Sequence, residues 1–314
     1  MTGGMSDERG RVRTIVNRTA ELAPLKTVAA KAIALAEDER TAALDLANVI
    51  SSDQALTSKL LRLANSAYYG YSRRVSNVRE AVILLGMRTV RSVAIASAIM
   101  EAFRPPPIEG WDPELFWAHS VMVGVVAEHL ARESRAARPE DAFTAGVVHD
   151  IGKLAMAVVE PDRFRATVRR ILDGVPPAEA ERESFGVEHW QVGSRLAQRW
   201  RFPEPLVAAI RDHARSEPKR LDSLADVVAA ANLACNKVGY AAGFDWSGEP
   251  ERLPKAALPR QVERCIEAVP GGIYALGERA HTFLTNMSSR PPRWYRTPLE
   301  EEESAEAGAA RAAS

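Results

Sequence analysis

The chain has few cysteines and no long apolar run. Its 314 residues include two cysteines, Cys235 and Cys265, too few for a disulfide framework or a zinc ribbon. The longest apolar runs, such as residues 81–87, are too short to span a bilayer, and residues 1–14 lack an apolar signal core. The formal net charge is zero, so no global attraction to nucleic acid or to an anionic membrane is expected. These absences predict a soluble, cytoplasmic protein.

Strand-like alternation is also missing, and helical spacing takes its place. Leu56, Leu60 and Leu63 lie on one face of a helix pattern over residues 53–70. Helix start signals agree with this period: Asn77 precedes Glu80 by three residues, and Asp112 stands directly before Pro113. We therefore expect an all-α fold.

A proline-rich segment at 103–113 divides the helical region of residues 15–287 into two lobes. The sequence predicts an N-terminal helical lobe over 15–104 and a second helical lobe over 112–287. Residues 1–14 are expected to be disordered, and so is the acidic tail at 288–314, which has too little apolar surface to fold. Residues 1–104 hold 15 Lys and Arg against 10 Asp and Glu. That excess is modest and no helix-turn-helix or zinc-finger pattern accompanies it, so nucleic-acid binding is disfavoured.

The stretch AGVVHDIGKLAM at 145–156 carries the strongest chemical signal. His149 and Asp150 stand side by side in an apolar run that is predicted to be helical. A phosphate-binding loop is excluded, because five residues separate Gly146 from Gly152 and Leu154 stands where a serine or threonine would hold magnesium. A paired histidine and aspartate suit a divalent metal such as Mn, Fe, Ni or Zn, provided that further ligands converge on them.

Further ligands for such a site occur in other predicted helices. Each of them, taken singly, is more often a hydrogen-bonded structural residue than a ligand. The candidates are His119 in FWAHSVMV, His189 in FGVEHWQVG, His213 in AAIRDHA and Asp226 in SLADVVAAAN.

The order and context of these residues resemble the HD superfamily of metal-dependent phosphohydrolases. His119, then His149-Asp150, then Asp226 follow its H…HD…D pattern. The resemblance is greatest to the HDOD domain, the HD-related output domain of bacterial signalling proteins, over roughly residues 18–240. Phrases such as LANVISSDQALTSKLLRLANSAYYG and EDAFTAGVVHDIGKLAM carry it. The resemblance implies an all-α fold whose second lobe is a degenerate HD domain, and a role in signal transduction.

The same resemblance implies roles for individual residues. His119, His149, Asp150 and Asp226 would hold a first metal, with Asp150 able to bridge to a second. His189 and His213 are similar to the extra ligands of the two-metal HD-GYP phosphodiesterases. Two features depart from that group: no GYP segment follows Asp150, and Asp212 rather than a second histidine precedes His213.

The residues leave three states of the site open: two metals that clamp a phosphoryl group, one metal that joins helices, or no metal and only core packing. We expect a regulatory protein that acts on a signalling protein partner or a nucleotide ligand, without a membrane. The alternative is a metal-dependent phosphohydrolase or phosphodiesterase, in which Asp150 and Lys153 would be catalytic.

A second candidate site is an interaction surface in NSAYYGYSRR at 65–74, because aromatic side chains and arginines are enriched at protein interfaces. The alternative is that one or two of the tyrosines belong to the core and the arginines are solvated. The residues concerned are Tyr68, Tyr69, Tyr71, Arg73 and Arg74.

Overall fold

The fold is all-α, as the sequence predicts. The computed structural model describes residues 2–25, 27–34, 39–70, 73–214, 220–246, 249 and 252–287. Within these residues the sheet is limited to one antiparallel pair of two-residue strands, β1 (Tyr240–Ala241) and β2 (Phe244–Asp245). The expected disorder of residues 288–314 falls outside the described residues.

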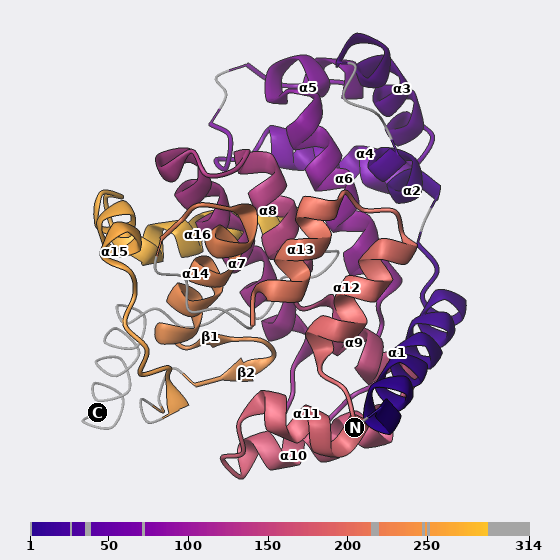
Figure 1. Cartoon of the computed structure of the whole chain (residues 1–314). Helices are drawn as coiled ribbons and strands as arrows, with labels where there is room; N and C mark the ends of the chain where they lie inside the picture. Colours follow the sequence, from indigo (N-terminus) through magenta and orange to yellow (C-terminus); the bar gives the residue numbers. More distant parts are fainter. Residues whose placement is uncertain are drawn as a thin grey trace, which may run out of the picture.

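Five helices of the N-terminal lobe lie together at the top of Figure 1. Two helix start signals that the sequence predicts are present in the structure. Asn77 accepts a hydrogen bond from the backbone N–H of Glu80, and Asp112 accepts one from Glu114 at the start of the next helix. The five helices are α2 (Thr27–Ala34), α3 (Glu39–Ser51), α4 (Gln54–Ala64), α5 (Val78–Leu85) and α6 (Met87–Ala102).

The centre of the molecule is α7 (Pro113–Ser134), a helix whose side chains are buried over most of its length. Three other helices pack on it (Figure 1): α8 (Pro139–Val148), α14 (Leu224–Lys237) and α16 (Gly272–Met287). Helix α7 approaches α8 closely, because a Cβ on Gly146 of α8 would lie 2.6 Å from the Cα of Gly124. This approach brings His119 and His149 together.

Of the remaining helices, α10 and α11 lie at the bottom of Figure 1 and α15 lies at its left edge. Helix α12 packs between α9 and α13, and α10 packs on α11. Their bounds are α9 (Ile151–Val159), α10 (Pro161–Leu172), α11 (Pro177–Phe185), α12 (His189–Arg199), α13 (Glu204–Asp212) and α15 (Arg260–Glu267).

Residues 2–14 are helical, which corrects the expectation of disorder there. They belong to α1 (Thr2–Leu22), which packs on α9 and α12 of the second lobe. Ile15, Val16 and Thr19 are buried at helical spacing, and the Arg11 guanidinium donates to the Phe185 carbonyl and pairs with Glu160. The helix that carries this apolar stripe includes residues 2–14, for which disorder was predicted. The predicted boundary at residue 15 therefore divides one helix.

Among the described residues, one unbent apolar segment has the length and hydropathy of a membrane span. It is Pro139–Val159, formed by α8 and α9, and 89% of its most apolar part is buried inside the protein. The burial is that of a core segment. The segment is interrupted at His149 and Asp150, which form a turn between the two helices. The sequence analysis placed these two residues inside one helix, so the break is a correction.

Candidate metal centre

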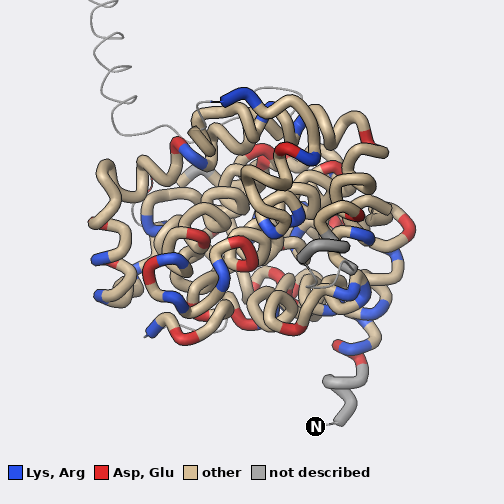
Figure 2. Tube along the Cα trace, turned by 90° about the horizontal axis from the view of Figure 1, so that it is seen from above, with Lys and Arg blue, Asp and Glu red and all other residues tan. Residues whose placement is uncertain are grey.

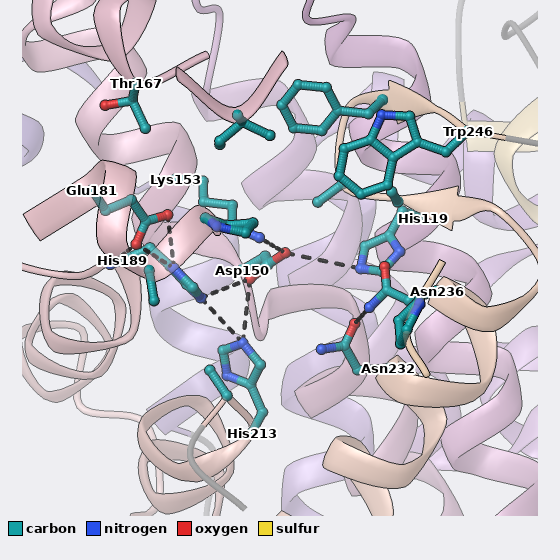
Figure 3. A pocket seen from close by; sticks show the side chains of 18 of the residues that line it. His119, Asp150, Lys153, Thr167, Glu181, His189, His213, Asn232, Asn236 and Trp246 are labelled. Carbon is teal, nitrogen blue, oxygen red and sulfur yellow. Dashed lines mark hydrogen bonds and ion pairs between the residues drawn. The ribbon is translucent and has the colours of Figure 1, made fainter. Parts of the chain in front are cut away.

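Asp150 lies at the centre of four histidines that come from four parts of the chain, and Figure 3 shows three of them, His119, His189 and His213. Its Oδ1 atom is 3.2 Å from His189 Nε2 and 3.3 Å from His213 Nε2. Its Oδ2 atom is 3.4 Å from His149 Nε2 and 3.8 Å from His119 Nε2. None of these five side chains is more than 7% exposed. The structure therefore brings together five of the six residues that the sequence proposes as ligands.

Each of the four imidazoles is held by an oxygen on its outer nitrogen. When Nδ1–H donates to such an oxygen, the Nε2 lone pair is left pointing at Asp150, which is how protein histidines are oriented for a metal. The oxygens are those of Tyr240 O at 2.6 Å from His119, Gly146 O at 2.7 Å from His149, Ile210 O at 2.8 Å from His213, and the Glu181 carboxylate at 2.7 Å from His189.

Glu181 is a site residue that the sequence analysis missed. It comes from α11, is 2% exposed, and also accepts a hydrogen bond of 2.9 Å from the His189 backbone N–H. The only available signal was a glutamate eight residues before a histidine, in a segment with four other charged residues between 179 and 188. A spacing of eight residues does not place Glu181 and His189 on one face of a helix, because Glu181 lies in α11 and His189 begins α12.

Asp226 does not join the cluster, and the prediction that it does is wrong. It lies in the first turn of α14, where its Oδ2 accepts a hydrogen bond of 2.7 Å from the exposed Ser223 hydroxyl. The α14 side chains that reach the site are Asn232 and Asn236, which lie beside His119 in Figure 3. Asn236 donates to the Asn232 carbonyl oxygen over 2.8 Å. An amide thus stands near His119 where the sequence analysis expected a carboxylate.

Lys153, one turn into α9, donates to Asp150 Oδ2 over 2.7 Å. Burial alone would raise the pKa of Asp150, but the cationic groups of Lys153 and the histidines hold it well below its usual range. Burial would likewise lower the pKa of His189, but the carboxylates of Glu181 and Asp150 raise it to about 9. The protein without metal therefore balances two buried carboxylates with two cations, Lys153 and His189.

That balance predicts the effect of removing the central carboxylate. We expect Asp150→Ala to lower the unfolding free energy of the metal-free protein by about 2 to 4 kcal/mol, because a buried cation loses its partner. Asp162→Ala, which removes a carboxylate that is 90% exposed, should cost less than about 1 kcal/mol. Urea unfolding with a chelator present measures both, and an Asp150→Ala protein as stable as the Asp162→Ala protein would contradict the balance of charges.

The donor atoms suit a metal ion in geometry as well as in kind. Asp150 Oδ1, His189 Nε2 and His213 Nε2 form a triangle with edges of 3.2, 3.3 and 3.3 Å. Bonds of about 2.1 Å place neighbouring ligands about 3.0 Å apart in an octahedron and about 3.4 Å apart in a tetrahedron. Asp150 Oδ1 is buried and faces these two imidazole nitrogens. This triangle therefore fits a divalent metal, and we call it the Oδ1 triad.

A second group of three, His119, His149 and Asp150 Oδ2, fits less well. Its edges are 3.3, 3.4 and 3.8 Å, and Lys153 already binds its carboxylate oxygen. The ammonium group repels a cation at this position, and Asn232 adds no negative charge to offset it. The two triads are therefore unequal.

A cavity of about 420 Å³ opens above the cluster. Asp150, Lys153 and three of the histidines line its floor, and Asn232 and Asn236 line one side (Figure 3). Most of the remaining wall is apolar, and four aromatic side chains contribute to it: Trp111, Phe164, Phe244 and Trp246. A cavity of this size, apolar with a few convergent polar groups, has the character of a small-molecule site.

The residues proposed as an interaction surface at 65–74 have two kinds of surroundings in the structure: the described tyrosines are partly buried and the arginines are exposed. Tyr68 is half-buried: its ring lies under Arg279 at 5.1 Å, and its hydroxyl donates to Glu128 over 3.4 Å. Tyr69 packs on the core beside it. Arg73 is exposed and pairs with Glu80, and Arg74 is exposed. Tyr71 lies outside the described residues. Tyr68 therefore connects the two lobes, and a surface for a partner at this position remains a prediction.

Comparison with known proteins shows the family of the chain. The model of the HDOD domain family matches residues 22–216. Among curated proteins, an uncharacterised protein of Treponema pallidum is 27% identical over 218 residues, which cover 68% of this chain and 41% of the relative. The match thus spans less than half of that relative's length.

Two solved structures resemble the fold over most of its length. A candidate phosphohydrolase of Shewanella amazonensis is 28% identical, with a TM-score of 0.63 over 85% of this chain and 97% of its own. An HDOD domain protein of unknown function from Geobacter sulfurreducens is 22% identical, with a TM-score of 0.67 over 98% of this chain and 97% of its own.

Proposed function

The chain belongs to the HDOD domain family, and we propose that it is a cytoplasmic signalling protein that binds one divalent metal ion and a small phosphate-bearing ligand. One observation carries the proposal: the Oδ1 triad lies on the floor of the 420 Å³ cavity, with its three donor atoms at the spacing of metal ligands. The signalling role is supported by the family.

A single metal is favoured over a pair. Asp150, His189 and His213 would hold it, and Glu181 behind His189 would add negative charge to the site. The position on the Oδ2 side of Asp150 already has a cation, the Lys153 ammonium group. When bound, the metal supplies Lewis acidity, which strengthens binding of an anionic oxygen.

The shape and polarity of the cavity suggest the class of ligand. Lys153 reaches its floor with 19% of the side chain exposed, so a phosphate group can accept from the ammonium while it faces the Oδ1 triad. Asn232 keeps an amide N–H₂ and Asn236 an amide oxygen outside their mutual hydrogen bond. Together with the aromatic wall, they suit a flat group that has donors and acceptors at its edge, as in a nucleotide.

Hydrolysis of a phosphate ester is the second candidate function. The observation that favours it is that each Asp150 oxygen faces two imidazoles, an arrangement that two bridged metals could use. The similarity to the candidate phosphohydrolase of Shewanella amazonensis supports it too. Asp150 and Lys153 would then position the phosphate. The single carboxylate among the inner ligands weighs against it, because two divalent ions would be poorly neutralised.

The proposal predicts the metal content of the protein. We expect one manganese, iron, nickel or zinc ion per chain after dialysis, and less than a tenth of this in His213→Gln, because an amide is a much weaker ligand for these ions than imidazole. The matched control is His129→Gln, since His129 lies outside the cluster and bonds the Cys265 carbonyl. Elemental analysis and calorimetric titration of the chelator-treated proteins measure both.

Three results would decide between the candidates. A wild type that binds no metal, or a His213→Gln protein that binds as much as wild type, would remove the proposed centre. Two ions per chain, with turnover of nucleotides that Lys153→Met abolishes, would favour the hydrolase. One ion per chain and metal-dependent nucleotide binding without turnover would support the signalling protein.

A further inference from the structure

A groove of about 780 Å³ lies between α1 and α12, outside the metal centre. Arginines from both helices line it: Arg9 and Arg13 from α1, and Arg195 from α12. Arg199, one turn after Arg195, lines an adjoining hollow together with Arg13 and Arg195. All four side chains are exposed. Figure 2 shows basic segments along the helix that leads from the N label into the body of the molecule. We call these four residues the arginine groove.

The positive charge of the arginine groove is not neutralised within the described residues. Arg195 donates to the Gln198 side chain over 3.1 Å and Arg199 to Asn17 over 3.4 Å, both neutral acceptors. None of the four arginines forms an ion pair with a described residue, in contrast to Arg211 at the groove, which pairs with Asp212. Glu8 is the acidic residue that lines the groove. Charges of one sign are thus concentrated in a concave site.

Repulsion between these arginines is built into the two helices. Arg9 and Arg13 are four residues apart, and so are Arg195 and Arg199, a spacing at which like charges oppose each other on a helix surface. Helix α1 cannot relieve this by turning, because Arg11 is bonded to Glu160 and to the Phe185 carbonyl on its other side, and Ile15 is fully buried. A bound anion would lower the electrostatic free energy of the groove.

We propose that the arginine groove binds an acidic peptide segment that contains consecutive glutamates. Guanidinium groups form paired hydrogen bonds with carboxylates, and four of them along two helices match a short run of side chains. Nucleic acid is a poorer fit, because its affinity rests on some six to ten phosphate contacts, whereas this groove offers four arginines and a glutamate. The net charge of the chain is also zero.

The chain's own sequence supplies a probe of this chemistry. Residues 297–306 read TPLEEEESAE, with four glutamates at 300–303, and they lie outside the described residues. A fluorescent peptide of this sequence is titrated with the full chain in which glutamines replace Glu300, Glu301, Glu302 and Glu303, so that the peptide alone carries the run. The comparison peptide is TPLQQQQSAE.

The decisive variants are Arg13→Ala with Arg195→Ala, and the matched control Arg169→Ala with Arg260→Ala. Each pair removes two positive charges from exposed positions, and circular dichroism confirms that both proteins are folded. We expect the groove pair to weaken binding of the glutamate peptide at least tenfold and the control pair less than twofold. Binding should weaken as salt is raised, because the contacts are ionic and exposed.

Three results would overturn the proposal. Equal affinity for the glutamate and glutamine peptides would show that charge does not direct binding. An equal loss in both variant pairs would show that only the net charge of the chain matters. Binding of a single-stranded oligonucleotide more tightly than the glutamate peptide, lost in the groove pair, would assign the groove to nucleic acid. Since the metal centre is untouched in these variants, none of these outcomes depends on the proposed function.

Discussion

Gly152→Ala is expected to abolish metal binding although residue 152 carries no ligand. A Cβ at this position would lie 1.9 Å from the His189 carbonyl oxygen and 2.9 Å from the Gly193 backbone nitrogen. Both are backbone atoms of α12, so no side-chain rotation can relieve the overlap. Helix α12 must move away from α9, and His189 and the Oδ1 triad move with it. We expect at least a hundredfold loss of metal affinity and a loss of about 2 to 4 kcal/mol in unfolding free energy, as overpacking against backbone is costly.

The control for this substitution is Gly10→Ala, which also lies in a helix but meets nothing within 4 Å. It should leave metal affinity unchanged and stability equal or slightly higher, since alanine is the better helix former. Calorimetric titration and urea unfolding of both variants give the comparison. A Gly152→Ala protein that binds metal as the wild type does would mean that α9 and α12 do not approach as closely as described.

The stability of the metal-free protein should fall steeply as the pH is lowered from 6.5 to 4.5. Burial lowers the pKa of His119 to about 3 and that of His213 to about 4, whereas in the unfolded chain both take up protons near pH 6.5. A folded pKa below the unfolded one means that stability is present above pH 6.5 and is lost below it. Two histidines give a slope of about 2 to 3 kcal/mol per pH unit.

His189 adds little to this slope. Its pKa is raised to about 9, so its contribution is complete below pH 6.5 and is lost only as the pH rises toward 9. The test is a series of urea unfolding curves at closely spaced pH values in the presence of a chelator. His213→Gln should roughly halve the slope. A flat profile between pH 6.5 and 5 in the wild type would show that the buried histidines are not held neutral.

The sequence predicts those residues of the candidate metal centre that can be recognised one at a time. A histidine in an apolar segment is rare enough to be noticed, and the order of His119, His149 and Asp150 matches a known family pattern. Asp226 was misjudged because an aspartate in a mostly apolar segment has two explanations. Ser223 three residues earlier is the signature of a helix cap, and the structure shows that cap. Local hydrogen bonding at a helix start thus accounts for its charge.

What the sequence does not predict depends on contacts between distant segments. The cavity joins residues from α7, α10, α11, α14 and the β1–β2 turn region, and no local pattern encodes a space that several elements enclose. Helix α1 shows the same limit. The polar residues of its first turns led to the prediction of a disordered N-terminus. Only its packing on α9 and α12 makes it part of the fold. The all-α class, in contrast, follows from periodicity alone and is confirmed.

Helix α7 links the candidate metal centre to the N-terminal helices. It carries His119 near one end and, nine residues later, Glu128, which accepts hydrogen bonds from Tyr68 and Arg279. Nine residues of α-helix span about 14 Å along the axis, and buried helices shift as units because their side chains are close-packed. One close-packed helix therefore connects the floor of the cavity, through His119, with the Tyr68 contact to the first lobe.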